Sequence, residues 1–410
     1  MTDLTDSGAG FTKAAGETAN AQYFVTILAS ITALSVLTFL YHLLNAPVFN
    51  TLSNAGCMML IAYSGITVLR SPHTSTMNIL YLAAACILTT LSIAFNWSQS
   101  SVTDGIKYLS IYIFYAAGHA YAAPLRSIET RYICFLAILP IAFLVAVGDS
   151  RVPDFVANNI GNTFSYFANA NIATLYFSAL VFALSDRLKG RAIFLQFLNA
   201  ALMNKIGAAV ATVVAVCLWI LIPLRKESVI ALTAFAAVSA IAFSLGAFDR
   251  AVTLLGSMSL LVELGPEVVS RMSFGKLVEL TGTTDLSGFF RVIHWANIWD
   301  IYSSGGLATL LFGYGIGQTP YLTVLQFVPH NDYLRILAEY GPLNLIVFVG
   351  FLLHVLSNLK TGHAKVLFMI LLIYFFSENL IDHFVSMTLY FTYAGRFSAM
   401  PVETEAETVR

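Results

Sequence analysis

Charged residues are scarce in this chain. Only 10% of its 410 residues are Asp, Glu, Lys or Arg, whereas about 25% is usual in a soluble domain. Hydrophobic residues make up 58%, and the mean hydropathy is +0.77. With so few charges, much of the surface must face lipid, so the bilayer is an expected partner. The net charge of −1 creates no field that attracts nucleic acid, and no such partner is expected.

Motifs for several common chemistries are also missing. The four cysteines lie in apolar runs without a CxxC pair, which suggests neither a disulfide framework nor a zinc site. There is no DxD pair, no HExxH and no carboxylate cluster at metal-ligand spacing, so we expect no metal and no cofactor. Ionisable residues are almost absent from the middles of the first eight apolar runs, which argues against a transporter or flippase.

Apolar runs of spanning length recur along the chain and predict an all-α polytopic membrane protein. About twelve transmembrane helices are expected, at residues 23–43, 48–69, 77–96, 107–124, 132–148, 167–185, 206–224, 228–247, 251–263, 342–358, 365–377 and 383–395. This divides the chain into an N-terminal tail (1–22), nine spans (23–263), a large loop (264–341), three spans (342–395) and a C-terminal tail (396–410). The tail 1–22 lacks a cleavable-signal pattern, so the first span is expected to remain as an anchor.

Positive charge gathers in alternate loops and orients these spans. One set of loops holds Arg70, Arg126, Arg131, Arg187, Lys189, Arg191, Lys205, Arg250, Lys360, Lys365 and Arg396. The opposite short loops hold only Lys107, Arg151 and the pair Arg225/Lys226. The positive-inside rule then places both termini in the cytoplasm and the loop 264–341 outside, in the periplasm of a Gram-negative cell.

The sequence VPHNDYLRILAEYGP, from residue 328, predicts a short helix over 332–340. Asn331 is a suitable N-cap and Gly341 suits the C-terminal stop. His330 is then held just before a helix N-terminus, beside exposed backbone donors, as a base next to an anion site would be. A polar cap at the membrane surface explains the same residues, so both interpretations stay open.

Two further stretches combine arginine with aromatic or basic neighbours. In TDLSGFFRVIHWANIWDIYSS, the residues Arg291, His294, Trp295 and Trp299 share one side of a predicted helix. This is typical of an interfacial helix with a snorkelling arginine, or of an arginine presented to a lipid-linked phosphate. Arg225 and Lys226, in LIPLRKESVIAL, form a hairpin turn or face the same anionic head group.

These features together resemble the O-antigen ligase and polymerase superfamily, bacterial membrane glycosyltransferases with a GT-C-like fold. Its ligase motif is His, then Asn, Ser or Gln, nine residues, Gly, two residues, then Gly, Thr or Tyr. His330, Asn331 and Gly341 match this motif, whereas Asn344 departs from it at the last position. The glycine-rich FGYGIG at 312–317, which permits close approach of a ligand, is similar to the family's sequence before the histidine. Arg225 and Arg291 match the arginines that the family places after the seventh span and in the large loop.

The resemblance implies metal-independent, inverting transfer of a glycan from an undecaprenyl-diphosphate carrier to a saccharide acceptor. His330 is then the catalytic base, and Arg225 and Arg291 bind the diphosphate. Supporting residues are Lys226, His294, Asn331, Arg335 and Gly341, and the expected acceptor or lipid contacts are Trp295, Trp299 and Tyr333.

The same resemblance implies an inner-membrane enzyme whose site faces the periplasm, with a possible chain-length regulator as partner. The short chain and the broken ligase motif favour a polymerase of surface or exopolysaccharide repeat units. A ligase that attaches polymer to lipid A-core is the alternative within the enzyme class. A polysaccharide-related transporter or flippase remains the alternative from another class.

The predicted topology is tested by cysteine labelling. In a variant without Cys57, Cys86, Cys134 and Cys217, single cysteines at 276 and 291 should react with an impermeant thiol reagent from outside. Cysteines at 187 and 360 should react only after the membrane is permeabilised. Labelling of position 276 from the cytoplasmic side would contradict an external site.

Overall fold

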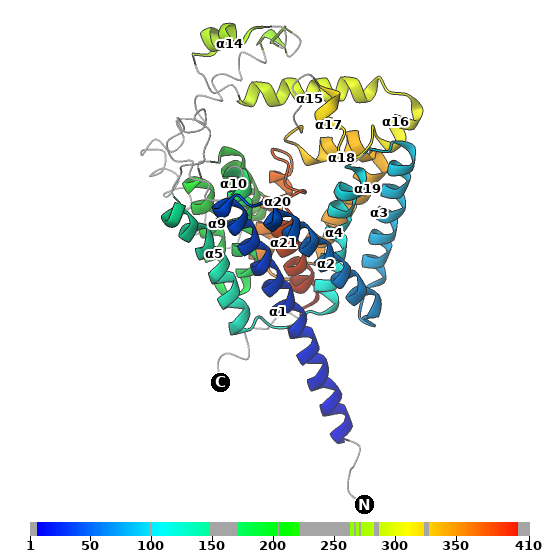
Figure 1. Cartoon of the computed structure of the whole chain (residues 1–410), viewed down its shortest axis with the longest axis vertical. Helices are drawn as coiled ribbons and strands as arrows, with labels where there is room; N and C mark the ends of the chain where they lie inside the picture. Colours follow the sequence, from blue (N-terminus) through cyan, green and yellow to red (C-terminus); the bar gives the residue numbers. More distant parts are fainter. Residues whose placement is uncertain are drawn as a thin grey trace, which may run out of the picture.

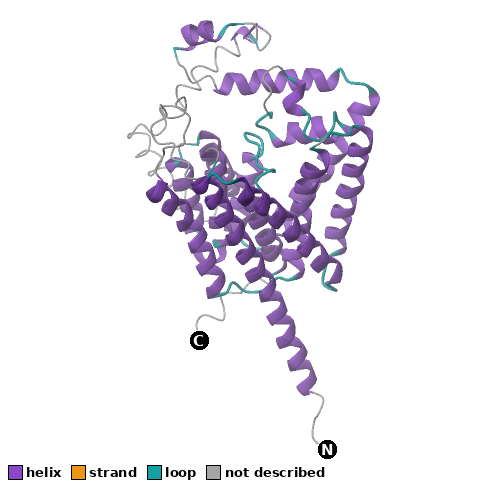
Figure 2. Cartoon of the chain, in the orientation of Figure 1, coloured by secondary structure: helices purple, strands orange, loops and turns teal. Residues whose placement is uncertain are grey.

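The computed structural model describes residues 6–98, 100–147, 167, 170–203, 205–221, 263–265, 268–269, 272–282, 287–323 and 328–400. Every regular element in these ranges is a helix (Figure 2). The all-α class predicted from the apolar runs is therefore confirmed.

Within the described residues, four stretches of helix are long and apolar enough to cross a membrane. They are residues Asn20–Leu44 of α1 (Asp6–Leu44), α2 (Pro47–Arg70), α3 (Thr76–Phe95) and most of α5 (Ser127–Val147). Large apolar side chains project outward from them, such as Leu69 at 86% and Val145 at 85% exposure. Surfaces of this kind are stable against lipid rather than water, which supports a membrane-embedded protein. α1 begins at Asp6, inside the predicted tail 1–22, in a stretch rich in alanine, a strong helix former.

Shorter apolar helices complete the bundle. They are α7 (Ala170–Ala183), α9 (Arg191–Leu202), α10 (Ile206–Leu221), α19 (Pro342–Asn358) and α20 (Gly362–Tyr374), with the short α8 (Ser185–Leu188) before α9. The predicted spans 228–247 and 251–263 lie outside the described residues. The total of twelve spans therefore remains a prediction.

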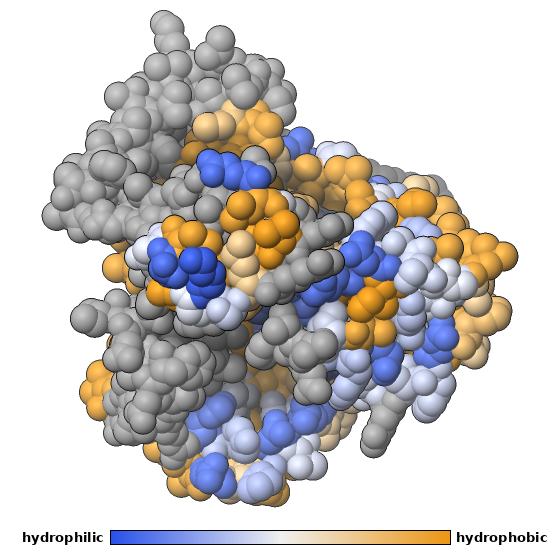
Figure 3. Space-filling view, turned by 90° about the horizontal axis from the view of Figure 1, so that it is seen from above, coloured by the Kyte–Doolittle hydropathy of each residue, from blue (hydrophilic) through white to orange (hydrophobic). Residues whose placement is uncertain are grey.

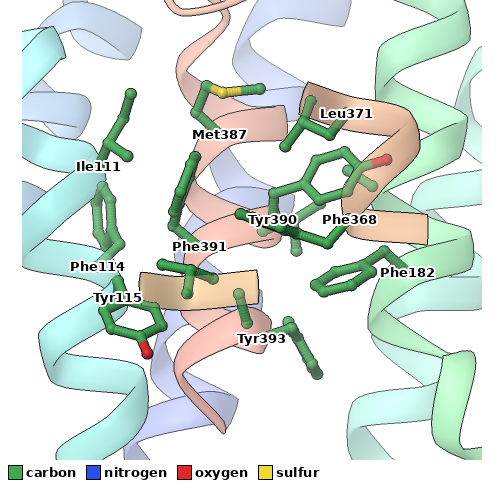
Figure 4. Close-up of a cluster of buried hydrophobic side chains, with 14 of the residues drawn as sticks. Ile111, Phe114, Tyr115, Phe182, Phe368, Leu371, Met387, Tyr390, Phe391 and Tyr393 are labelled. Atoms are coloured by element: carbon green, nitrogen blue, oxygen red, sulfur yellow. The ribbon is translucent and has the colours of Figure 1, made fainter. Parts of the chain in front are cut away.

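Two comparatively polar helices, α4 (Ser101–Ala120) and α21 (Phe384–Ala399), pack against each other with their backbones in contact. Gly118 and Gly395 make this possible, because a Cβ at either would overlap with backbone of the opposite helix. Aromatic and aliphatic side chains of α4, α7, α20 and α21 fill the adjoining core (Figure 4). Since α4 and α21 are largely covered by protein, they tolerate polar residues that a lipid-facing helix does not.

A buried ion pair fixes the end of α21. Arg396 donates through Nη1 to Glu129 Oε2 at 2.7 Å, and both side chains are fully buried. The guanidinium also lies 4.4 Å from the centre of the Phe24 ring. The sequence predicts Arg396 in a cytoplasmic loop because it follows the last apolar run. It is instead an internal residue of α21, since its charge is compensated inside the protein.

The direction of α10 differs from the prediction. The alternation of loops makes residues 206–224 parallel to 365–377, but α10 runs antiparallel to α20. Gly207 lies against Ser377 and Trp219 against Gly362. The cause is α9, an additional helix antiparallel to α7, in which Gln196 and Asn199 are buried. Their polarity made α9 resemble a loop in the sequence.

The segment predicted as a loop at 264–341 is largely helical where it is described. It contains α14 (Phe274–Thr281), α15 (Ser287–Ser303), α16 (Leu307–Phe312), α17 (Thr319–Leu322) and α18 (Asp332–Tyr340). α15 extends across the end of the bundle opposite the start of α1 and the end of α21, with α18 beneath it (Figure 1). Seen from this end, the surface of the described residues mixes hydrophilic and hydrophobic groups (Figure 3).

The contact between α4 and α21 predicts a specific sensitivity. Gly395→Ala should lower the free energy of unfolding by about 1–3 kcal/mol, and with it the melting temperature of the purified protein, or abolish folding. The reason is that the added methyl group pushes the two helices apart. Gly65→Ala, in the middle of α2, is the matched control, since nothing lies within 4 Å of its Cβ position. Equal melting temperatures for the two variants would show that the close contact is not required.

Candidate functional site

A buried carboxylate joins three distant parts of the chain at the α15 end of the bundle. Glu378 lies between α20 and α21, with its side chain only 4% exposed. Its Oε1 accepts a hydrogen bond from Arg291 Nη2 at 2.8 Å, and its Oε2 lies 3.2 Å from His330 Nδ1. Asn171 Nδ2 donates to Oε2 at 2.5 Å. The structure thus brings the predicted arginine and histidine together on a carboxylate that is not among the predicted site residues.

His330 is held in an unusual backbone conformation. Its φ is 48°, in the left-handed region that residues other than glycine rarely adopt. The carbonyl of the preceding Pro329 accepts a hydrogen bond from the Trp295 indole of α15. The amide of Asp332 donates to Phe375 O at 2.8 Å. These bonds fix the chain on both sides of His330, as expected where strain is maintained for a function.

The nine-residue spacing of the motif is the length of α18. Asn331 Oδ1 accepts from Leu334 N at 3.0 Å and begins the helix, and Gly341 follows its last residue. Gly341 has φ 86°, and a Cβ there would overlap with the carbonyl of Leu311. The predicted helix 332–340 is confirmed, and both of its predicted boundary residues have a structural reason.

The glycine-rich stretch 312–317 packs against the C-terminal end of α18. Tyr314 N donates to Ala338 O at 2.7 Å. Gly313 has no room for a side chain because a Cβ would overlap with Glu339 backbone. Asn96 Nδ2 donates to Gly313 O at 2.6 Å and connects the stretch to the end of α3. The close approach that these glycines permit is therefore to protein backbone at Gly313, whereas the sequence suggested a ligand.

Asn344, the residue at which the sequence departs from the ligase motif, also supports α18. Its side-chain amide donates to Tyr340 O at 3.0 Å, and Ser92 Oγ donates to the same carbonyl at 2.8 Å. These donors satisfy a carbonyl at the end of a helix that would otherwise lack a partner. A change at this motif position therefore alters the hydrogen bonds that support the C-terminal end of α18.

A second ionic cluster attaches α18 to the segment after Glu378. Arg335, predicted as a supporting residue, donates through Nε to Glu339 Oε2 at 3.1 Å and through Nη1 to Asp382. Burial opposes ionisation of Asp382, but the Arg335 guanidinium prevails and lowers the pKa of this carboxyl. Asp332 Oδ2 accepts from Leu380 N at 2.6 Å, although burial raises the pKa of Asp332.

The other predicted residues occupy different surroundings. His294 is buried, with Nδ1 3.4 Å from Thr323 Oγ1, and Trp299 is 52% exposed. Tyr333 donates to Leu372 O at 2.8 Å, and its ring lies near Phe348 and Phe375. Its ring and hydroxyl therefore contact the protein interior, which leaves Trp295 and Trp299, both on α15, as the remaining predicted aromatic contacts. Arg225 and Lys226 lie outside the described residues.

The arrangement is suited to proton transfer beside an anion. A carboxylate accepts hydrogen bonds, so Glu378 favours the proton on Nδ1 of His330 and leaves the lone pair on Nε2. The His330 side chain is 40% exposed and that of Arg291 30% exposed, so both are accessible. The position of Glu378 in YFFSENLIDHF, an acid beside a predicted span, was an available sequence signal. No comparable signal marked Asn171.

In comparisons with known proteins, no family model matches the chain and no curated protein matches its sequence. The resemblance to the O-antigen ligase and polymerase superfamily therefore depends on the motif residues themselves.

The cap of α18 gives a prediction for the position of His330. Asn331→Ala should destabilise the protein by about 1 kcal/mol, because it removes the acceptor for Leu334 N, and should also reduce any activity that requires His330. Asn331→Asp should retain both. Ser273→Ala, which removes the equivalent cap from Lys276 N on α14, is the control and should leave activity intact. Equal loss of activity in both alanine variants would argue against a special role for the α18 cap.

Proposed function

We propose that this protein is a membrane glycosyltransferase that moves a glycan from an undecaprenyl-diphosphate carrier to a saccharide hydroxyl. The observation that carries the proposal is the meeting of Arg291 and His330 on Glu378. A base and a cation, both accessible and joined by one buried carboxylate, are the groups that such a transfer needs. The α15 end lies opposite the start of α1 and the end of α21, as a periplasmic site requires if those helix ends are cytoplasmic (Figure 1).

His330 acts on the acceptor in this proposal. Its Nε2 takes the proton of the acceptor hydroxyl while the oxygen attacks the anomeric carbon of the donor glycan. Glu378 is the positioning residue, since its bond to Nδ1 orients the ring and stabilises the imidazolium that forms. Attack from the side opposite the leaving group inverts the anomeric configuration.

Arg291 acts on the leaving group. As the bond from the anomeric carbon to the phosphate oxygen breaks, negative charge grows on the diphosphate. A guanidinium presents several N–H donors in a plane and stabilises this charge without a metal ion. Trp295 and Trp299, on the same helix, are suited to contact a sugar face or the prenyl chain.

The acceptor defines the two forms of this activity. A growing glycan as acceptor gives a polymerase of surface polysaccharide repeat units, which we propose because Asn344 breaks the ligase pattern. A lipid A-core acceptor gives a ligase. Both use the same base and the same arginine, so incubation of the purified protein with each acceptor separates them.

The proposed chemistry is tested with purified protein, a lipid-diphosphate oligosaccharide and a saccharide acceptor. His330→Ala should lower the transfer rate by about 100-fold or more, the scale for loss of a positioned base. Glu378→Gln should also lower the rate, because the amide no longer selects the Nδ1-protonated ring. EDTA should have no effect. His363→Ala is the control, since His363 pairs with Asp186 remote from the site.

Full activity of His330→Ala would overturn the assignment of the base. Transfer that EDTA abolishes and Mg²⁺ or Mn²⁺ restores would overturn the metal-independent mechanism.

A further inference from the structure

We propose that Glu378 is a displaceable counter-ion for Arg291, and that a diphosphate takes its place on the guanidinium. The inference rests on the proposed function for the class of anion, and it goes further by assigning an order of contacts. Before the donor binds, Glu378 contacts both Arg291 and His330. Once the diphosphate holds Arg291, the carboxylate serves His330 and Asn171 alone.

The charge of the site favours this exchange. Arg291 contributes one positive charge and Glu378 one negative charge, so a diphosphate approaching the free site meets no net attraction from the pair. A carboxylate at 2.8 Å also competes for the donors that the phosphate oxygens need. The anion therefore binds more tightly once Glu378 has given up its contact with Arg291.

Arg291 is the partner free to move. Its side chain is 30% exposed, whereas that of Glu378 is 4% exposed. The contact with the carboxylate uses Nη2 of a guanidinium that has five N–H donors. It is a single hydrogen bond to one oxygen, without the bidentate geometry that makes an arginine–carboxylate pair strongest.

Glu378 and His330 stay in place when Arg291 leaves. Asn171 holds Oε2 from α7, and the amides of Leu380 and Ile381 donate to Asp332 Oδ2. The indole of Trp295 donates to the Pro329 carbonyl, just before His330. This bond does not involve the Arg291 side chain, although both residues lie on α15. A movement of the Arg291 side chain therefore leaves the bond between His330 and Glu378 intact.

The exchange couples donor binding to the base. While Arg291 contacts Glu378, it withdraws negative charge from the carboxylate that supports His330. When the diphosphate holds Arg291, Oε1 of Glu378 no longer accepts from the guanidinium, and the carboxylate is left to orient the His330 ring. The base is thus supported by an unshared carboxylate once the donor is bound.

Binding of farnesyl diphosphate to the purified full-length protein tests the exchange by calorimetry, with farnesol as the uncharged control. Glu378→Gln should bind farnesyl diphosphate about tenfold more tightly than the unchanged protein, although it transfers glycan more slowly. Arg291→Gln should bind it about tenfold more weakly. Glu279→Gln removes the same charge from α14, where Glu279 pairs with Lys276, and should leave the affinity unchanged.

The double variant Arg291→Gln/Glu378→Gln separates competition from general repulsion. If Glu378 competes for Arg291, the gain from Glu378→Gln should vanish without the arginine. The exchange would be overturned by any of three results: a gain in affinity that persists in the double variant, no gain in affinity in Glu378→Gln, or no binding of farnesyl diphosphate to the unchanged protein. If the glutamine variant does not fold, Glu378→Asp replaces it. The shorter side chain keeps the charge but no longer reaches Arg291, so this variant should also bind farnesyl diphosphate more tightly.

The same measurements distinguish this inference from the proposed function. If Glu378→Gln binds farnesyl diphosphate more tightly only when Arg291 is present, but the protein shows no transferase activity, the exchange is supported and the proposed glycosyltransferase function is contradicted. If the protein is an active transferase but Glu378→Gln does not bind farnesyl diphosphate more tightly, the exchange is contradicted and the proposed function stands.

Discussion

A carboxylate buried at the end of the bundle, that of Glu378, requires compensation, and this requirement organises the surrounding elements. An unpaired charge in such a position is strongly unfavourable. Its partners are Asn171 of α7, Arg291 of α15 and His330, which precedes α18. They lie 207, 87 and 48 positions from Glu378 in the sequence. One side chain therefore connects α7, α15 and the segment that precedes α18.

The position of Glu378 depends in turn on the central pair of helices. α21 begins shortly after Glu378, and its close packing against α4 at Gly118 and Gly395 fixes where that connection lies. The buried pair of Arg396 with Glu129 holds the far end of α21. Polar residues inside the bundle thus anchor α21 at both ends, while the apolar helices around it provide the lipid-facing surface.

Local chemistry was predictable from the sequence, whereas pairing across the bundle was not. The helix 332–340 followed from Asn331 and Gly341, because capping depends on neighbouring residues. α9 was missed because the buried amides of Gln196 and Asn199 are indistinguishable from exposed ones in a sequence. Arg396 was misplaced for the same reason. Arg291 and His330 were selected, but their shared partner Glu378 required the fold, since its contacts span most of the chain.

The structure also separates the residues of the motif by what they do. Asn331, Gly341 and Asn344 begin, end and support α18, and Gly313 allows close packing against it. These residues act on the structure of α18 through steric and hydrogen-bonding effects that do not depend on a ligand. His330 differs, because its ring is accessible and its strained backbone serves no capping role. The spacing of the motif is thus a constraint on the length of a helix. The chemistry depends on one histidine, one arginine and the carboxylate between them.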